Sequence, residues 1–240
     1  MIKTRISKNI SCISCSAKHL CLGKDLTSPS FSHLDQLIKN VKLVAKKDHI
    51  YHMNHPLTSL YAVHQGSCKE YWIDENGNEC ITNFYFPGDI IGIESVSKQK
   101  YMFYTTALED MELCIIPIND FLESMHAFPE ILKRFLAITN QKMQHDHSTR
   151  TGITANEKVS DFLLNIARRM HERNPGEKEI CLTMSQVDIA NFLGIAAETI
   201  NRIFNTLKRK KIIKLKSKKF EVLNIAELQK LGRLDYTKIY

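Results

Sequence analysis

Three cysteines near the start of the chain have a spacing that could bind a metal. Cys12, Cys15 and Cys21 fall within ten residues, and the chain holds seven cysteines in all. Three soft thiolates can wrap one metal centre, and a fourth completes an iron–sulfur cluster or a zinc site. His19 lies in the same segment, where it could bind zinc but is expected to face solvent. Spacing alone leaves the fourth ligand open, because a lone strand cysteine is usually a small core residue.

A second set of residues, toward the other end of the chain, has the order of a helix-turn-helix. Thr183-Met-Ser-Gln186 fits a capping box and predicts a helix start. Gly194 then supplies a turn, and Ile200 and Ile203 give the next helix an apolar inner face. Two helices locked across a turn glycine are typical of a motif that lays its second helix in the major groove of DNA.

The outer face of that second helix carries side chains able to read bases. Glu198 can accept a hydrogen bond from cytosine, and Arg202 can donate two to guanine. The alternative is an ordinary ion pair between them on a solvated helix face. The expected DNA contacts are Glu198, Asn201, Arg202, Thr183, Ser185, Lys208 and Lys218.

A basic run follows the second helix. Residues 208–219 contain eight Lys or Arg and no acid, framed by apolar residues that predict a short hairpin, or wing. Residues 183–240 carry a net charge of +7, equal to that of the whole chain, so residues 1–182 are neutral. A localised positive field favours a polyanion, with nucleic acid before an anionic membrane, although a charge run can also be a solvated face. Lysines on phosphates would set affinity and salt dependence without reading sequence.

The elements between these two sets change type along the chain. A short helix is expected behind Ser28 or Ser30 as N-cap. Between residues 41 and 117, short runs rich in β-branched and aromatic residues predict antiparallel strands of a sandwich or barrel. Asn76-Gly77 predicts a hairpin with a type I′ turn, which needs positive φ at both residues.

A long helix is expected after Pro129. Five of its residues recur at steps of four and three, the spacing of a coiled-coil seam: Leu132, Leu136, Thr139, Met143 and Asp146. We expect a homodimer interface there, the alternative being a stripe that packs on its own barrel. A carboxylate facing its symmetry mate would weaken the dimer, or Asp146 points to solvent.

Domain boundaries and cell compartment follow from the same patterns. Gly152 is expected to end the long helix. Together with the other patterns, this predicts an arm at 1–27, a β domain at 28–128, a dimer helix at 129–151 and a DNA-binding domain at 152–240. No apolar stretch is long enough for a signal peptide or a membrane span, so we expect a cytoplasmic protein with no membrane partner. In that compartment the cysteines are expected to be thiols, ligands or sensors.

Taken in order, these segments resemble the Crp/Fnr family over nearly the whole chain. The resemblance rests on the cysteine arm, on Phe86-Pro-Gly-Asp-Ile-Ile-Gly92, on the long helix and on the segment from Thr183 to Arg202. The most similar branch is the oxygen-responsive one of fumarate and nitrate reduction regulators. The resemblance implies an α+β fold: the arm and an antiparallel β-roll of the cyclic-nucleotide-binding kind, the dimerisation helix, and a winged helix-turn-helix.

The resemblance also implies a cofactor and a mechanism. It assigns a four-iron four-sulfur cluster to Cys12, Cys15, Cys21 and Cys114, with Ser16 and Leu20 where the branch shields the cluster from oxygen. Oxygen would convert the cluster, the dimer would come apart, and the protein would leave its DNA. Asp146 falls where this branch has an acidic residue that keeps the cluster-free form monomeric. The other three cysteines, Cys68, Cys80 and Cys181, receive no role beyond packing.

The resemblance also implies which molecules the protein binds. The resemblance implies palindromic DNA with TTGAT-like half-sites, although Asn201 replaces the serine usual in the branch and leaves the base it reads open. A hairpin that matches a loop touching RNA polymerase is formed by Asp74, Glu75, Asn76, Gly77 and Asn78. Family members that bind a cyclic nucleotide carry a glutamate and an arginine that hold it. Here Asp89 replaces the glutamate, and residues 104–106 lack the arginine that would pair with phosphate, so no cyclic nucleotide is expected.

Two rival hypotheses remain beside this one. A regulator of the same fold could use the cysteines for zinc or thiol redox chemistry. An enzyme with a catalytic cysteine is the other, but no Cys-His-Asn or Ser-His-Asp grouping is evident among the motifs, so we expect no enzymatic activity.

Overall fold

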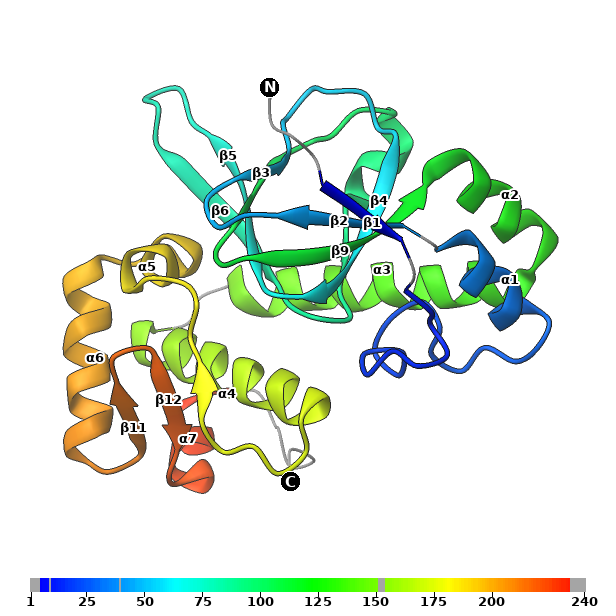
Figure 1. Ribbon diagram of the computed structural model, residues 1–240. Helices are drawn as coiled ribbons and strands as arrows, with labels where there is room; N and C mark the ends of the chain where they lie inside the picture. Colours follow the sequence, from blue (N-terminus) through cyan, green and yellow to red (C-terminus); the bar gives the residue numbers. More distant parts are fainter. Residues whose placement is uncertain (1–4, 9, 39, 151–153, 234–240) are drawn as a thin grey trace. The chain divides into compact units, whose positions relative to one another are not determined.

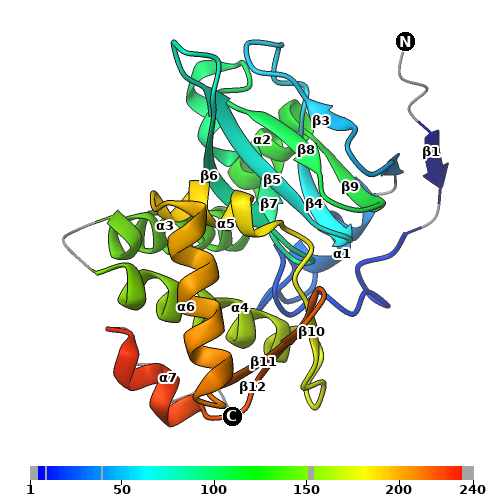
Figure 2. The ribbon, with the colours of Figure 1, turned by 90° about the vertical axis from the view of Figure 1, so that its left-hand side faces the viewer.

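The computed structural model describes residues 5–8, 10–38, 40–150 and 154–233, with the side chains of 5–8 and 143–150 left outside the description. The chain divides into two compact units, Met1–Gln144 and His145–Tyr240. Figures 1 and 2 show the elements of each unit. Among the described residues, no helix combines the length and the apolar character needed to cross a lipid bilayer.

The first unit is a β-roll of two antiparallel sheets, which confirms the expected sandwich or barrel. One sheet has five strands in the order β1 (Arg5–Lys8), β2 (Asn40–Val44), β9 (Met111–Pro117), β4 (Ser59–Gln65) and β7 (Ile90–Ile91). The other has four, in the order β3 (His49–Tyr51), β8 (Tyr104–Ala107), β5 (Cys68–Ile73) and β6 (Glu79–Tyr85). A short 3-10 helix, η1 (Ile93–Lys98), follows β7. Strand β1 was not expected from the sequence of the arm.

The core of this unit is centred on strands β4 and β9, where buried residues follow one another along the strand. Leu60 on β4 and Leu113 and Ile116 on β9 are fully buried. Strands β4 and β9 pair directly, with Leu60 opposite Ile116 and Ala62 opposite Cys114. Side chains two residues apart share one face of a strand, so this register fixes which residues face the arm.

The hairpin between β5 and β6 is present, but its predicted turn type is wrong. Gly77 has φ +83°, whereas Asn76 is not among the described residues with positive φ. The Asp74 carboxylate instead accepts hydrogen bonds from the backbone N–H groups of Asn76 at 2.9 Å and Asn78 at 2.8 Å. The loop is therefore ordered by an aspartate cap with a single left-handed glycine.

The first unit also contains α1 (Ser30–Leu37), α2 (Ile118–Ala127) and α3 (Pro129–Arg150) as far as Gln144. The residue before α1 is Pro29, with no side-chain cap, so the prediction of Ser28 or Ser30 as N-cap is wrong. Helix α2 was not expected. A proline at the first position of α3 fits a helix start, because that residue needs no backbone donor.

Helix α3 has two apolar faces with different surroundings. Ile131 is fully buried, and Phe135 and Ile138 pack against the β-roll core. Leu132 and Leu136, one turn apart on another face, are 40% and 51% exposed. These two leucines therefore do not pack on their own β-roll. The side chains of Met143 and Asp146 lie outside the described part of the chain.

The second unit contains the expected helix-turn-helix and wing. Its elements are α4 (Ala155–Arg173), β10 (Ile180–Cys181), α5 (Gln186–Leu193), α6 (Ala197–Arg209), β11 (Ile213–Lys216), β12 (Lys219–Val222) and α7 (Ile225–Leu231). The strands form one small antiparallel sheet in the order β10, β12, β11. Gly152, predicted to end the long helix, lies outside the described residues.

The start of α5 differs from the prediction. The N-cap is Ser185, and its capping partner is Asp188, so the predicted box of Thr183 and Gln186 is wrong. The Asp188 carboxylate accepts from the Ser185 backbone N–H at 3.0 Å, and the Ser185 hydroxyl accepts from the Asp188 N–H at 3.0 Å. A carboxylate at this position also suits the positive end of the helix dipole.

Candidate metal centre and nucleic-acid interface

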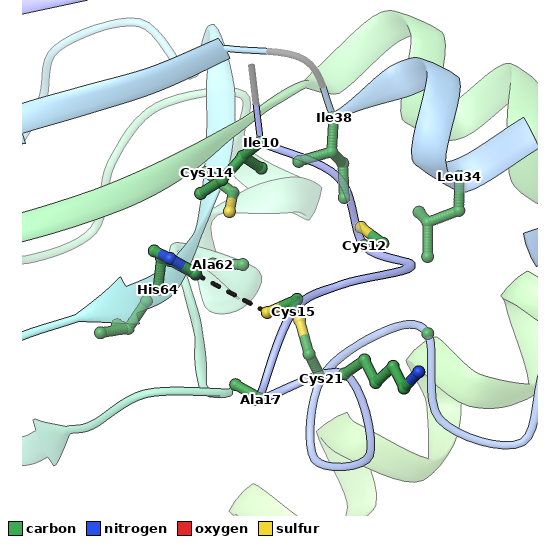
Figure 3. Close-up of a pocket in the computed structure, with 13 residues that line it drawn as sticks. Ile10, Cys12, Cys15, Ala17, Cys21, Leu34, Ile38, Ala62, His64 and Cys114 are labelled. Carbon is green, nitrogen blue, oxygen red and sulfur yellow. Dashed lines mark hydrogen bonds between the residues drawn. The ribbon is translucent and has the colours of Figure 1, made fainter. Parts of the chain in front are cut away.

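The four predicted ligands lie around one pocket (Figure 3). Cys12, Cys15 and Cys21 come from the arm and Cys114 from β9, and all four are free thiols. The rest of the lining is largely apolar and includes Ile10, Ala17, Leu34, Ile38, Ala62 and Val63. In the described part of the chain, no three His, Cys, Asp or Glu side chains already form a set that could hold a metal ion. The four thiols share a pocket without forming a closed ligand cage.

Hydrogen bonds fix the arm against the β-roll and the helices. The Asp35 carboxylate on α1 accepts from the backbone N–H of Cys12 and from the Ser11 hydroxyl, the latter at 2.9 Å. The Arg134 guanidinium on α3 donates to the carbonyl oxygens of Leu20 at 2.7 Å and Cys21 at 3.0 Å. The segment that carries the cysteines is thus tied to two helices of the first unit.

A turn of the β-roll also meets the arm. Gly88 has φ +93°, and a Cβ atom there would lie 2.7 Å from the Cβ atom of Leu20. Only glycine suits both this backbone conformation and this close approach. Leu20 is half-buried in this contact, whereas Ser16, the other residue expected to shield the cysteines, is exposed.

Burial separates the protonation behaviour of the four thiols. It raises the pKa of Cys12 to about 12 and that of Cys21 to about 11, and it raises the pKa of Cys114 further. Mutual repulsion between the cysteines adds to each of these rises. Cys15 differs, because a hydrogen bond with His64 lowers the pKa of its thiol. A ligand set of this kind must release protons to bind a cation, and a cation in the pocket would relieve the repulsion.

Sequence reasoning missed His64, which lines the same pocket from β4. Its Nδ1 atom lies 3.6 Å from the Cys15 Sγ atom, the contact drawn as a dashed line in Figure 3. His19, considered from the sequence as a zinc ligand, is exposed and is not among the residues that line the pocket. His64 is far from the arm in sequence, so no local motif could identify it.

The remaining cysteines lie elsewhere. Cys68 is fully buried, as expected for a core residue, and Cys80 is half-buried on β6. Cys181 is exposed, so packing does not account for it. None of these three lines the pocket of the other four.

The β-roll interior holds a charged network that the sequence did not indicate. Glu70 on β5 is 1% exposed and accepts hydrogen bonds from the Tyr85 hydroxyl at 2.9 Å and the Thr82 hydroxyl at 3.0 Å. The Lys142 ammonium on α3 lies 3.6 Å from Glu70 Oε1 and 2.8 Å from Glu94 Oε2. Burial raises the pKa of Glu70 to about 8, despite the opposing effect of Lys142.

Helix α6 presents the side chains expected to read DNA. Ile200, Ile203, Phe204 and Leu207 are buried on its inner face, while Glu198, Asn201 and Arg202 are exposed on the other. Among the ion pairs of the described residues, none joins Glu198 to Arg202. The arrangement therefore leaves both side chains available to a partner. Gly194, with φ +62°, makes the turn into α6, and the Lys158 ammonium donates to the Leu193 carbonyl at 3.0 Å.

The eight basic residues of 208–219 are all exposed. Two of them have acidic neighbours: Lys214 lies 3.3 Å from Glu221, and Lys219 lies 3.0 Å from Glu179. These two lysines are partly neutralised within the protein. Lys208 and Lys218 are exposed, Thr183 is half-buried, and Ser185 is exposed with its hydroxyl in the α5 cap.

The hairpin expected to meet RNA polymerase projects from the β-roll. Glu75, Asn76, Gly77 and Asn78 are exposed, and Asp74 is half-buried. Trp72 and Ile73, just before the loop, are 41% and 45% exposed. Large apolar side chains on a protruding hairpin are typical of a surface that contacts another protein.

Asp89 and Thr105 lie where family members that bind a cyclic nucleotide hold its phosphate, and here both face other parts of the protein. The Asp89 carboxylate accepts from the Phe86 backbone N–H at 2.7 Å, which closes the turn at Gly88. Thr105 on β8 is fully buried. Neither position offers a cation to a phosphate group.

Comparison with known proteins accounts for both units. A cyclic nucleotide-binding domain model matches residues 41–127, and a Crp-like helix-turn-helix domain model matches residues 157–231. The FixK2 structure from Bradyrhizobium japonicum has a TM-score of 0.74, with 23% identity over 81% of this chain and 98% of that one. This likeness supports the same fold.

Relatives of similar length match over most of the chain. The fumarate and nitrate reduction regulatory protein of Vibrio cholerae is 30% identical over 93% of this chain and 90% of its own length. Electron transport regulator A of Shewanella oneidensis is 31% identical over the same shares of both chains. The proteins of this family are transcription regulators and not enzymes. This chain belongs to the Crp/Fnr family of transcription regulators, in the branch of the fumarate and nitrate reduction regulators.

Proposed function

We propose that this protein is an oxygen-responsive, homodimeric transcription regulator whose DNA binding depends on a four-iron four-sulfur cluster held by Cys12, Cys15, Cys21 and Cys114. The observation that carries the proposal is that these four free thiols, from segments far apart in sequence, line one pocket. The names of relatives support it, since they include an anaerobic regulatory protein of Aggregatibacter actinomycetemcomitans that is 29% identical.

The donor set fits such a cluster. Four cysteine thiolates are its usual protein ligands, and an apolar lining limits the access of water. When bound, the cluster supplies a redox-active, oxygen-sensitive centre. The chain supplies the rest: Asp35 and Arg134 hold the arm, and Gly88 and Leu20 cover one approach to it.

Helix α3 is the proposed route from sensor to dimer. Arg134 binds the carbonyl of Cys21 itself, and it lies on the same helix as the exposed Leu132 and Leu136. A change in the arm would therefore disturb the helix that carries the proposed interface. Asp146 and Met143 extend this interface in our proposal, with Asp146 making the dimer marginal. A marginal dimer needs a differential stabilisation of only about 5 kcal/mol for a near-complete switch.

DNA binding is proposed to use two kinds of contact. Glu198 and Arg202 read the inner bases of TTGAT-like half-sites, and Asn201 reads a neighbouring base. Thr183, Ser185, Lys208 and Lys218 contact the phosphate backbone and set orientation and affinity. All of these side chains except the half-buried Thr183 are exposed, which supports this division.

Two further parts of the proposal concern partners. The hairpin of Asp74, Glu75, Asn76, Gly77 and Asn78 contacts RNA polymerase, supported by the exposed Trp72 beside it. No cyclic nucleotide regulates the protein, because the turn at Asp89 offers no cation to a phosphate. A DNA-binding regulator of this kind works in the cytoplasm.

A second candidate is zinc or thiol redox sensing by the same cysteines. The contact between Cys15 and His64 favours it, since a thiol paired with an imidazole is easily ionised. A zinc-loaded or thiol-based regulator would be colourless and would contain no sulfide.

DNA binding with and without oxygen tests the proposal. Anaerobically purified protein is titrated onto a palindromic TTGAT duplex, then the titration is repeated after exposure to air, with sedimentation velocity on both samples. We expect tight binding and a dimer without oxygen, and weak binding and a monomer in air. Equal binding in both conditions would contradict the proposal. Leu136→Glu is expected to be a monomer even without oxygen, whereas the exposed Leu122→Glu on α2, its matched control, should still form the dimer there.

A further inference from the structure

His64 occupies a special place at the cysteine pocket. It lies on β4, in a half-buried position, with its Nδ1 atom 3.6 Å from the Cys15 Sγ atom. Figure 3 shows the imidazole directed toward this sulfur from the side of the pocket formed by the β-roll. Among the hydrogen bonds of the described residues, Cys15 is the one of these four thiols whose sulfur has a side-chain partner.

The strand pairing explains why His64 points there. Val63 pairs with Leu113 and Gln65 pairs with Glu112, so the register shifts at His64. An extra residue in one strand is a bulge, and bulges redirect side chains at the edge of functional sites. The regular alternation of β4 therefore changes where the strand passes the arm.

A carboxylate holds the ring from its other side. Glu112 Oε2 lies 3.8 Å from His64 Nε2, and Glu112 precedes the pocket residue Cys114 by two positions on the same strand. The order of groups is carboxylate, imidazole, sulfur. A carboxylate beside one ring nitrogen fixes the orientation of the ring, so that the other nitrogen stays directed at the sulfur.

We propose that His64 is a positioning residue that donates a hydrogen bond to the Cys15 sulfur when this cysteine is an iron–sulfur ligand, and that Glu112 orients it. The inference rests on the proposed function. Hydrogen bonds to ligand sulfurs draw electron density from a cluster and raise its reduction potential. His64 thereby makes the cluster harder to oxidise and slows its reaction with oxygen.

Four anaerobically loaded variants test this role: His64→Leu, which removes the donor; His64→Gln, which keeps an N–H; Glu112→Gln; and His126→Gln, an exposed histidine on α2 as control. Iron and sulfide per chain are measured first, then the midpoint potential and the rate of bleaching at a fixed oxygen concentration. An ordinary hydrogen bond corresponds to roughly a three- to tenfold change in an equilibrium or rate.

The expected pattern is graded. His64→Leu keeps its iron and sulfide, bleaches roughly three- to tenfold faster, and has a potential about 30 to 60 mV more negative, which is the same factor for one electron. Glu112→Gln shifts both readings in the same direction by less, His64→Gln restores most of the wild-type values, and His126→Gln matches the wild type.

Three results would overturn the inference. If His64→Leu keeps its iron and sulfide and shows an unchanged potential and bleaching rate, His64 donates no hydrogen bond that affects the cluster. Iron loss from a folded His64→Leu protein would make His64 a ligand instead. If the wild-type protein itself contains no iron or sulfide, the proposed function is wrong. The measurement of iron and sulfide per chain is enough to show this.

Discussion

The two units hold their functional chemistry in opposite ways. In the first unit, four thiols share an apolar pocket, and Glu70 lies beneath the β-roll surface with 1% exposure. In the second unit, Glu198, Arg202 and the basic residues of 208–219 are exposed. A buried ligand set acts together, because all its members bind one metal centre, whose positive charge offsets their mutual repulsion. Exposed contacts to DNA act largely one by one.

Removing one thiol should have the largest effect. In Cys114→Ser we expect complete loss of the bound iron, because three thiolates leave the cluster without its fourth ligand. Iron and sulfide analysis after anaerobic reconstitution measures it, with circular dichroism to check folding. Cys80→Ser, half-buried outside the pocket, is the matched control and should keep its iron. Partial iron loss in Cys114→Ser would show that the four thiols do not act together, and the contrast with the DNA contacts of the second unit would fail.

Removing one base contact should have a smaller effect. Arg202→Ala is expected to cost roughly 1 to 3 kcal/mol of binding free energy on a cognate site and to relax discrimination at one guanine. Fluorescence anisotropy with substituted half-sites measures both. Arg209→Ala, exposed at the end of the same helix, should weaken binding without changing base preference. Unchanged discrimination in Arg202→Ala would mean that α6 does not read this base.

The buried carboxylate predicts a pH effect confined to the first unit. The pKa of Glu70 is raised from 4.5 to about 8 in the folded protein, so the folded state keeps a proton that the unfolded chain releases. Stability should therefore fall as pH rises through this window. Glu70→Gln should lose this fall, a difference on the order of 3 kcal/mol in unfolding free energy between pH 5 and 8.

Thermal or denaturant unfolding at several pH values measures this difference. The control is Glu75→Gln, which is exposed on the hairpin and should follow the wild type. Parallel pH profiles for the wild type and Glu70→Gln would show that Glu70 is ionised at neutral pH in the folded protein.

A single phosphate contact should give the smallest effect. Lys218→Gln is expected to weaken binding to every sequence alike and to reduce the slope of log affinity against log salt by about 1. Binding titrations at several salt concentrations give this slope. Lys214→Gln should change it less, because Glu221 and Glu179 already neutralise that lysine. A change in sequence preference with Lys218→Gln would contradict its role as a backbone contact.

The same contrast explains what could be predicted from sequence. Both helices of the helix-turn-helix lie between Gln186 and Arg209, and the wing follows directly, so local patterns identify the helices, the turn at Gly194 and the wing. The capping box was misplaced by two residues, because Thr183 with Gln186 and Ser185 with Asp188 both fit the pattern. Only the backbone conformation at Ser185 decides between them.

The sensor unit depended on contacts between distant segments. The arm cysteines were evident from spacing, but Cys114 was named through the family resemblance alone. His64 and Arg134 reach the arm from 49 and 113 residues away, and no local pattern marks such partners. Lys142 and Glu70 were missed for the same reason, since their pairing requires α3 to lie against the β-roll.

Quantifying iron and acid-labile sulfide in strictly anaerobic protein, together with its visible spectrum before and after air, tests the central claim most directly. We expect four of each per chain, a broad visible absorbance that fades in air, and the loss of all three signals in Cys114→Ser. A colourless protein without sulfide, or one with the same spectrum in Cys114→Ser, would contradict it.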